Sequence, residues 1–197
     1  MKITLLIISL FATVMWAQSS TKTNLDVVNS LVEESIKSSI DGLPFEDIAY
    51  YINFNSAPEY NLMSNRAEIA LGKLVTVTDN KAKALYNLSY TIEEIRTSYI
   101  NPEKDGLFGS YNLTREISLK GTFVVGSLGS LIRSDDFEQT YSDTVEFDSV
   151  KDLETMSLPF TRGKKPDEPF FSSLLEPAIA LGAIAITIVL FFTVRSN

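Results

Sequence analysis

The strongest constraint on this chain is an uncharged stretch near its C-terminal end. Residues 178–194 are 17 consecutive residues without a charged side chain, which is the lower limit for a helix that crosses a bilayer. At about 1.5 Å rise per residue, such a helix is roughly 25 Å long. Glu176 precedes the stretch and Arg195 follows it at once. The pattern predicts a transmembrane helix from Ala178 to Val194.

Two other interpretations of this stretch stay open. It could be a buried core helix, or part of a glycolipid-anchor signal for which Ser172 and Ser173 would be the small residues. Within the stretch, Ala178 and Gly182 form a pair of small residues four positions apart, which permits close packing of membrane helices. The predicted membrane-anchor residues are therefore Ala178, Gly182, Val194 and Arg195.

The N-terminal end predicts a secretory signal peptide over residues 1–17. Lys2 supplies the positive charge, residues 3–14 supply the apolar segment, and cleavage is expected between Ala17 and Gln18. An uncleaved anchor helix is the alternative. With an exported N-terminus, Arg195 is expected on the cytoplasmic side. The sequence thus predicts a single-pass protein of the cell membrane, with its body periplasmic or extracellular and residues 195–197 as a cytoplasmic tail.

Composition excludes several kinds of chemistry. The chain has 25 acidic and 17 basic residues, a formal net charge of −8, and neither Cys nor His. Zinc sites built from Cys or His, Ser-His-Asp triads, thiol nucleophiles and disulfides are therefore impossible. A lipidated N-terminal Cys is excluded as well. The acidic balance argues against duplex nucleic acid as a partner, because phosphates demand a basic surface. No catalytic residue, metal ligand or cofactor is predicted.

The end of the predicted body and the residues between it and the predicted span have an unusual composition. Eight acids and one base, Lys151, fall within residues 134–154. Clustered carboxylates can bind calcium, but the spacing is not that of an EF-hand loop, and a solvated edge and linker is the favoured interpretation. Four of the seven prolines lie between residues 159 and 177. Residues 155–177 are therefore predicted to be an extended tether rich in proline and charge.

Residues 18–154 are expected to form one α+β domain. Asn24 is the expected cap of a helix that ends near Ile40, and a strand with one buried face follows at Ile48–Phe54. Ser56–Glu59 has the pattern of a capping box with proline at the first helical position, which predicts a helix to Leu74. A short strand over residues 74–78 then completes a strand–helix–strand unit.

The second half of this domain predicts an antiparallel meander. Long segments of β-rich composition cover residues 85–100 and 111–125, and a third begins at Leu131 after a turn around Gly129. The fold class expected is α+β, with one mainly antiparallel sheet and two packed helices, plus the C-terminal transmembrane helix. Inward-facing core candidates of the second segment are Leu113, Ile117, Leu119 and Phe123.

The element order of residues 45–140 resembles a known kind of envelope domain. A helix that begins at Ser56–Glu59 lies between two strands, and the meander ends in Gly129-Ser130-Leu131-Ile132-Arg133-Ser134. This layout is similar to that of the small periplasmic domains of the CsgG and LpoB type. The resemblance implies a protein that assembles or activates membrane machinery by contact and not by catalysis. It assigns no functional residue.

The sequence therefore favours a non-enzymatic interaction or scaffold module of the cell envelope, tethered to the membrane. The partners expected are the membrane and other envelope proteins, and no oligomeric state is predicted. A small-ligand-binding or hydrolytic domain that faces the periplasm is the alternative. A tether of 19 residues, from Pro159 to Pro177, would reach roughly 60 Å if fully extended.

Overall fold

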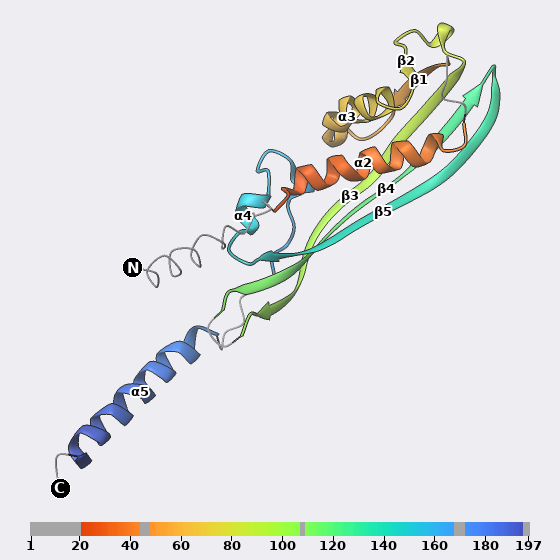
Figure 1. Cartoon of the computed structure of the whole chain (residues 1–197). Coiled ribbons are helices and arrows are strands. Elements are labelled where there is room, and N and C mark those ends of the chain that lie inside the picture. Colours follow the sequence, from red (N-terminus) through yellow and green to blue (C-terminus); the bar gives the residue numbers. More distant parts are fainter. Residues whose placement is uncertain (1–20, 44–47, 107–108, 168–171, 195–197) are drawn as a thin grey trace, which may run out of the picture.

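The described residues form one five-stranded sheet with the strand order β2-β1-β3-β4-β5, and helices α2, α3 and α4 lie against one face of it, while α5 projects away from it (Figure 1). This confirms the predicted α+β class. The computed structural model describes residues 21–43, 48–106, 109–167 and 172–194. The predicted signal peptide at residues 1–17 and the predicted tail at residues 195–197 lie outside the described residues.

Three long antiparallel strands make up most of the sheet. They are β3 (Tyr86–Lys104), β4 (Tyr111–Ser127) and β5 (Ser130–Glu146). At roughly 3.3 Å per residue, a strand of 17 residues such as β4 is about 55 Å long. The predicted meander is confirmed, but β5 extends to Glu146, so much of the acidic run that was predicted to be an edge and linker is an edge strand.

The strand–helix–strand unit is also present. Strand β1 (Ala49–Phe54) pairs in parallel with both β3 and β2 (Thr76–Val77). Helix α3 (Asn61–Gly72) connects β1 to β2. A single turn of 3₁₀ helix, η2 (Lys81–Lys83), then leads into β3.

Helix α2 covers Asn24–Ile40. Asn24, the predicted cap, is therefore already the first helical residue. Thr23 is the cap: its hydroxyl accepts a hydrogen bond from the backbone N–H of Asp26 at 3.2 Å. The Asp26 carboxylate accepts one from the backbone N–H of Thr23, also at 3.2 Å. The prediction of Asn24 as the cap is wrong, because Asn24 is needed inside the fold, where its side chain is buried.

The predicted capping box at Ser56–Glu59 is absent. A turn of 3₁₀ helix, η1 (Pro58–Tyr60), precedes α3, and neither helix has a side-chain cap. The Ser56 hydroxyl instead accepts a hydrogen bond from the backbone N–H of Ile92 at 2.6 Å. Ile92 lies where the β3–β4 register shifts, so tertiary contact with an irregular strand takes the serine away from the helix.

The main core lies between the sheet and the two helices α2 and α3. Alternate residues of β4 face it, in agreement with the predicted Ile117, Leu119 and Phe123, while the fourth predicted residue, Leu113, is buried in a second cluster. On β3 the buried positions are even-numbered up to Ile92 and odd-numbered from Ile95 onward, because the bulge between them inserts one residue. Large side chains of the main core are Ile36, Ile40, Tyr50, Met63, Leu71, Leu88, Tyr90, Ile117, Leu119 and Phe123.

A second, smaller cluster covers the part of the sheet beyond the start of α2. It is held by the short helix α4 (Val150–Leu153), and its buried members are Tyr99, Leu113, Val145, Phe147, Val150 and Leu153. The chain then forms a 3₁₀ turn, η3 (Pro159–Thr161), with Phe160 and Thr161 buried. The Phe160 ring meets that of Tyr60 edge-on, with centroids 5.8 Å apart.

The start of the predicted tether is therefore part of the folded body. Gly163 passes so close to β3 that an added Cβ would lie 2.8 Å from the carbonyl oxygen of Thr97 and 2.9 Å from the Tyr99 ring. Lys165 lies over the Phe147 ring at 3.3 Å from its centroid. Proline-rich composition predicted an extended chain here, but Phe160 supplies enough apolar surface to fix this segment on the sheet.

Candidate functional site: an apolar helix, a polar clasp and open surfaces

The predicted membrane-anchor residues fall on helix α5 (Ser172–Val194). Ala178 and Gly182 are exposed, and a Cβ added to Gly182 would meet nothing within 4 Å. Val194 ends the helix, and Arg195 lies outside the described residues. Among the helices of the described part of the chain, none has both the length and the apolarity to cross a membrane. The predicted crossing is thus not supported, and close packing through Ala178 and Gly182 stays a prediction.

The described side chains of α5 nevertheless form an extended apolar surface. Every residue from 178 to 193 is exposed. Large apolar residues among them are Ile179, Leu181, Ile184, Ile186, Ile188, Val189, Leu190, Phe191 and Phe192. Surfaces of this kind are rare on soluble monomers and mark contact with a membrane or a protein.

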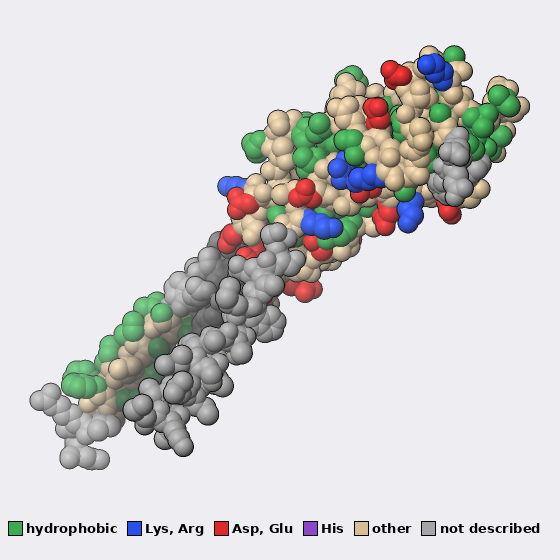
Figure 2. All heavy atoms as spheres, turned by 45° about the horizontal axis from the view of Figure 1, so that its top comes forward, with side chains coloured by type: hydrophobic (Ala, Val, Ile, Leu, Met, Phe, Trp, Pro, Cys, Tyr) green, Lys and Arg blue, Asp and Glu red, His purple; other side chains and the backbone are tan. Residues whose placement is uncertain are grey.

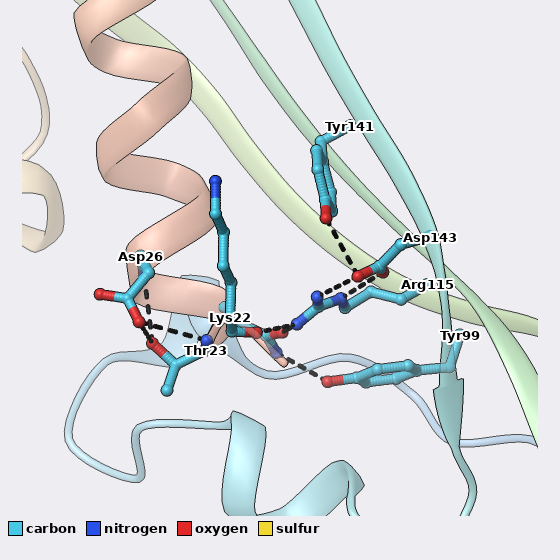
Figure 3. A network of polar contacts seen from close by, with 8 residues as sticks. Lys22, Thr23, Asp26, Tyr99, Arg115, Tyr141 and Asp143 are labelled. Atoms are coloured by element: carbon cyan, nitrogen blue, oxygen red, sulfur yellow. Dashed lines mark hydrogen bonds and ion pairs between the residues drawn. The ribbon is translucent and has the colours of Figure 1, made fainter. Parts of the chain in front are cut away.

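A buried arginine organises the most connected polar network of the body, drawn in Figure 3. Arg115 lies on the helix-facing side of β4, between the main core and the second cluster, and its side chain is 0% exposed. Its Nε and Nη2 donate to the two carboxylate oxygens of Asp143 on β5, at 2.8 and 2.5 Å. Its Nη1 donates to the backbone carbonyl of Lys22 and to Asn24 Oδ1, both at 2.8 Å.

Asn24 carries this network to the segment that follows α4. Its amide nitrogen donates to the Tyr99 hydroxyl and to the backbone carbonyl of Thr161, both at 2.7 Å. We call Asn24, Tyr99, Arg115, Tyr141 and Asp143 the polar clasp. It joins the start of α2, strands β3, β4 and β5, and η3 by bonds between residues up to 137 positions apart in sequence.

The electrostatics of the polar clasp are those of a satisfied structural network. Burial lowers the pKa of Arg115, but the hydrogen bond and charge of Asp143 outweigh it, so the pKa is raised and the guanidinium stays charged. Burial also raises the pKa of Tyr99 and of Tyr141, whose hydroxyl donates to Asp143 at 3.1 Å. Each nitrogen of Arg115 has a partner within the protein. The hydrogen bonds of Arg115 therefore hold the fold together.

Sequence reasoning missed the polar clasp, although a signal was present. Arg115 has the same strand parity as the predicted core residues Leu113 and Ile117. A charged residue on the apolar face of a strand is almost never buried unless it is paired. Its partner Asp143 belongs to the acidic run, whose composition favours a solvated edge, and only the extension of β5 past Asp143 reveals the pair.

The acidic run of residues 134–154 is distributed along β5 and α4. Within the described residues no three carboxylates converge on a point where a metal ion could be held. Several of these acids have partners within the body. Asp135 pairs with Arg133 at 3.7 Å and Glu138 with Lys120 at 2.8 Å, while Glu154 accepts a hydrogen bond from the Gly163 backbone at 2.9 Å.

An open groove of about 390 Å³ runs between α2 and β5. Lys22, Lys37, Glu34 and Tyr141 contribute polar groups to its walls. Glu33, which also lines the groove, is paired with Arg66 at 2.6 Å and with Lys73 at 2.8 Å. The hydrogen bond from Lys73 lowers the pKa of Glu33, against a smaller opposing effect of burial. These pairs connect α2 to α3.

Comparisons with known proteins give only distant likenesses. No protein-family model matches the chain, and no curated protein matches it. Among solved structures, a minor lipoprotein from Acinetobacter baumannii is similar over 53% of this chain and 70% of its own, at 10% identity and a TM-score of 0.33. The rare lipoprotein B from Shewanella oneidensis is similar over 71% of this chain and 96% of its own, at 14% identity and a TM-score of 0.31. At TM-scores of 0.33 and 0.31, neither likeness assigns this chain a function.

Proposed function

We propose that this protein is a non-enzymatic interaction module of the cell envelope, held at a membrane through α5. The observation that carries the proposal is the contrast between the body and α5. The body buries its apolar side chains in two clusters, whereas residues 178–193 expose theirs to the surroundings. Burying such a surface in lipid removes it from water at a gain of roughly 25 cal/mol per Å².

The orientation and the mode of attachment belong to the same proposal. The body is outside the cytoplasm, and the exposed apolar side chains of α5 hold it at the membrane. The tether is then the chain between Lys165 and α5, shorter than the sequence pattern predicts. The module works by contact with envelope proteins, and strand β5, whose 17 residues form an edge of the sheet within the described part of the chain, is available for pairing with a partner strand.

Attachment is tested by membrane fractionation of cells that produce the full chain. We expect the chain in the membrane pellet after an alkaline wash, because apolar burial does not depend on charge. A chain shortened by deletion of residues 172–197 should be soluble. Protease added to intact spheroplasts should digest the body while a cytoplasmic marker survives. Survival of the body alongside that marker would show that the orientation is wrong.

Interaction is tested separately by crosslinking in native membranes. A photoreactive residue in place of Thr140, which is exposed on β5, should give adducts with a defined set of envelope proteins. The matched control replaces Ser157, which is exposed outside the sheet. If both positions give only the monomer, the interaction role is contradicted, even where attachment through α5 holds.

A further inference from the structure

The turn between β4 and β5 holds a leucine in a backbone conformation that disfavours it. Ser127 pairs with Ser130, so Leu128 and Gly129 form a two-residue turn, with φ of 51° and 82°. Positive φ at both positions is the type I′ pattern, for which Asn-Gly is the usual sequence. In Leu128 the Cβ crowds the backbone carbonyl. Folding alone therefore favours another residue here, yet the side chain of Leu128 is 86% exposed.

Other exposed aliphatic side chains surround this turn. Leu131 is 67% exposed and Ile132 is 49% exposed, and Val124 on β4 is 39% exposed. We call these three residues and Leu128 the hairpin tip. Figure 2 shows hydrophobic side chains at the end of the body that lies away from α5. The hairpin tip is convex, because its side chains project from the turn and from the strands that lead into it.

Basic residues lie at the same end of the sheet. Tyr86, the first residue of β3, pairs with Ser127, so η2 lies next to the hairpin tip in the sheet order. Lys81 and Lys83 of η2 are exposed, and η2 contains no acid. The acid nearest to η2 in sequence is Asp79, and the acid nearest to the hairpin tip is Asp135. Asp135 is paired with Arg133. An exposed basic pair therefore lies beside an apolar tip in a chain whose formal net charge is −8.

We propose that the hairpin tip inserts into a lipid bilayer that carries anionic headgroups, with Lys81 and Lys83 against those headgroups. A fluid bilayer closes around a convex apolar tip, whereas a protein partner would need a deep pocket of matching shape. Four aliphatic side chains give weak, reversible binding that needs a second attachment. The hairpin tip and α5 lie at opposite ends of the molecule (Figure 1). The bilayer at the tip is therefore a different one from the membrane that holds α5. This inference rests on the proposed attachment of α5.

The test uses the full chain held through α5 in nanodiscs of neutral phosphatidylcholine. Separate vesicles that contain phosphatidylglycerol are added, and flotation measures how many nanodiscs rise with them. We expect co-flotation, and a loss of roughly tenfold in binding for Leu128→Asn combined with Ile132→Thr, because both remove apolar area from the tip. Asparagine tolerates positive φ, so the turn keeps its conformation. Lys81→Gln with Lys83→Gln should abolish the preference for anionic over neutral vesicles.

The matched control is Met156→Ser, which removes an apolar side chain that is 77% exposed near α4 and far from the tip. It should bind vesicles like the parent chain. An equal loss in this control, or unchanged binding by the tip variant with native circular dichroism, would overturn the proposal. Association of two nanodiscs without vesicles, abolished by the tip variant, would assign the tip to a second copy and overturn it too. If the chain stays out of nanodiscs, the attachment of α5 fails, and the same variants are compared by direct flotation with the anionic vesicles.

Discussion

The two ends of the helix-covered face of the sheet are stabilised in different ways. Under α2 and α3 the cover is regular helix, which satisfies its own backbone hydrogen bonds, and the interior is almost wholly apolar. Beyond the start of α2 the cover is the short helix α4 and the irregular segment around Phe160. There the backbone needs donors from side chains: Thr97 donates to the carbonyl of Phe160 at 2.9 Å, and Asn24 donates to that of Thr161.

This difference explains why polar side chains are buried where they are. Buried carbonyls without partners are costly, so an irregular cover requires polar residues beneath it. Arg115 lies at the boundary between the two ends and satisfies the carbonyl of Lys22, where the chain enters α2. The apolar cluster under α4 gives packing without direction, and the polar clasp adds the specific attachment through Asn24 and Arg115.

The largest expected effect comes from removal of the buried cation. Arg115→Met leaves Asp143 and Asn24 without their main partner, and breaking a buried pair in this way costs about 3–5 kcal/mol. The free energy of unfolding is measured by urea denaturation in detergent, followed by circular dichroism. The matched control is Lys120→Met on the same strand, whose pair with Glu138 is exposed on the opposite face and should contribute less than about 1 kcal/mol. Equal losses in the two variants would refute the structural role of the polar clasp.

Truncation of one leucine at each end of the sheet sharpens the comparison. Leu88→Ala in the main core and Leu113→Ala in the second cluster each remove a fully buried side chain and should cost about 2–5 kcal/mol if unfolding is global. We expect the full loss only for Leu88→Ala, because the cluster under α4 can open locally. Hydrogen exchange should show faster exchange confined to residues 99–113 and 145–161 in Leu113→Ala. Uniform acceleration over the whole body would contradict two separable ends.

The smallest expected effect is a loss of stability at alkaline pH. Burial raises the pKa of Tyr90 in the main core and of Tyr99 in the polar clasp. The unfolded chain ionises its tyrosines near pH 10, whereas the folded chain keeps these two neutral. The contribution of these two tyrosines to the free energy of unfolding is therefore complete below pH 10. It is lost as the pH rises through their pKa values in the folded chain. Urea midpoints measured at pH 8 and above pH 10 should differ less in Tyr90→Phe and in Tyr99→Phe than in the parent chain. If the difference between the two midpoints is as large in both variants as in the parent chain, this assignment is contradicted.

Local patterns of the sequence predicted the elements but not the contacts that modify them. The predicted helix that ends near Ile40 is α2, and alternation in β1 and β4 indicated their buried faces. The register of β3 could be followed only to Ile92, because a bulge changes which residues face inward and leaves no signature in a single chain. Local rules predict Ser56 and Asn24 as helix caps. Both side chains instead form hydrogen bonds with residues that are distant in sequence.

What the sequence determined by itself is everything that depends on neighbours within a few residues: the α+β class, the order of the elements, the turn at Gly129 and the apolar character of residues 178–194. The tertiary structure decided which polar groups are buried and where the body ends. Arg115 and Asn24 are 91 positions apart, and only the docking of α2 on the sheet brings them together. Phe160 could join the body only because the main core, including the Tyr60 ring, creates a surface for it. Such long-range burial depends on the shape of the whole fold, which no short window of sequence contains.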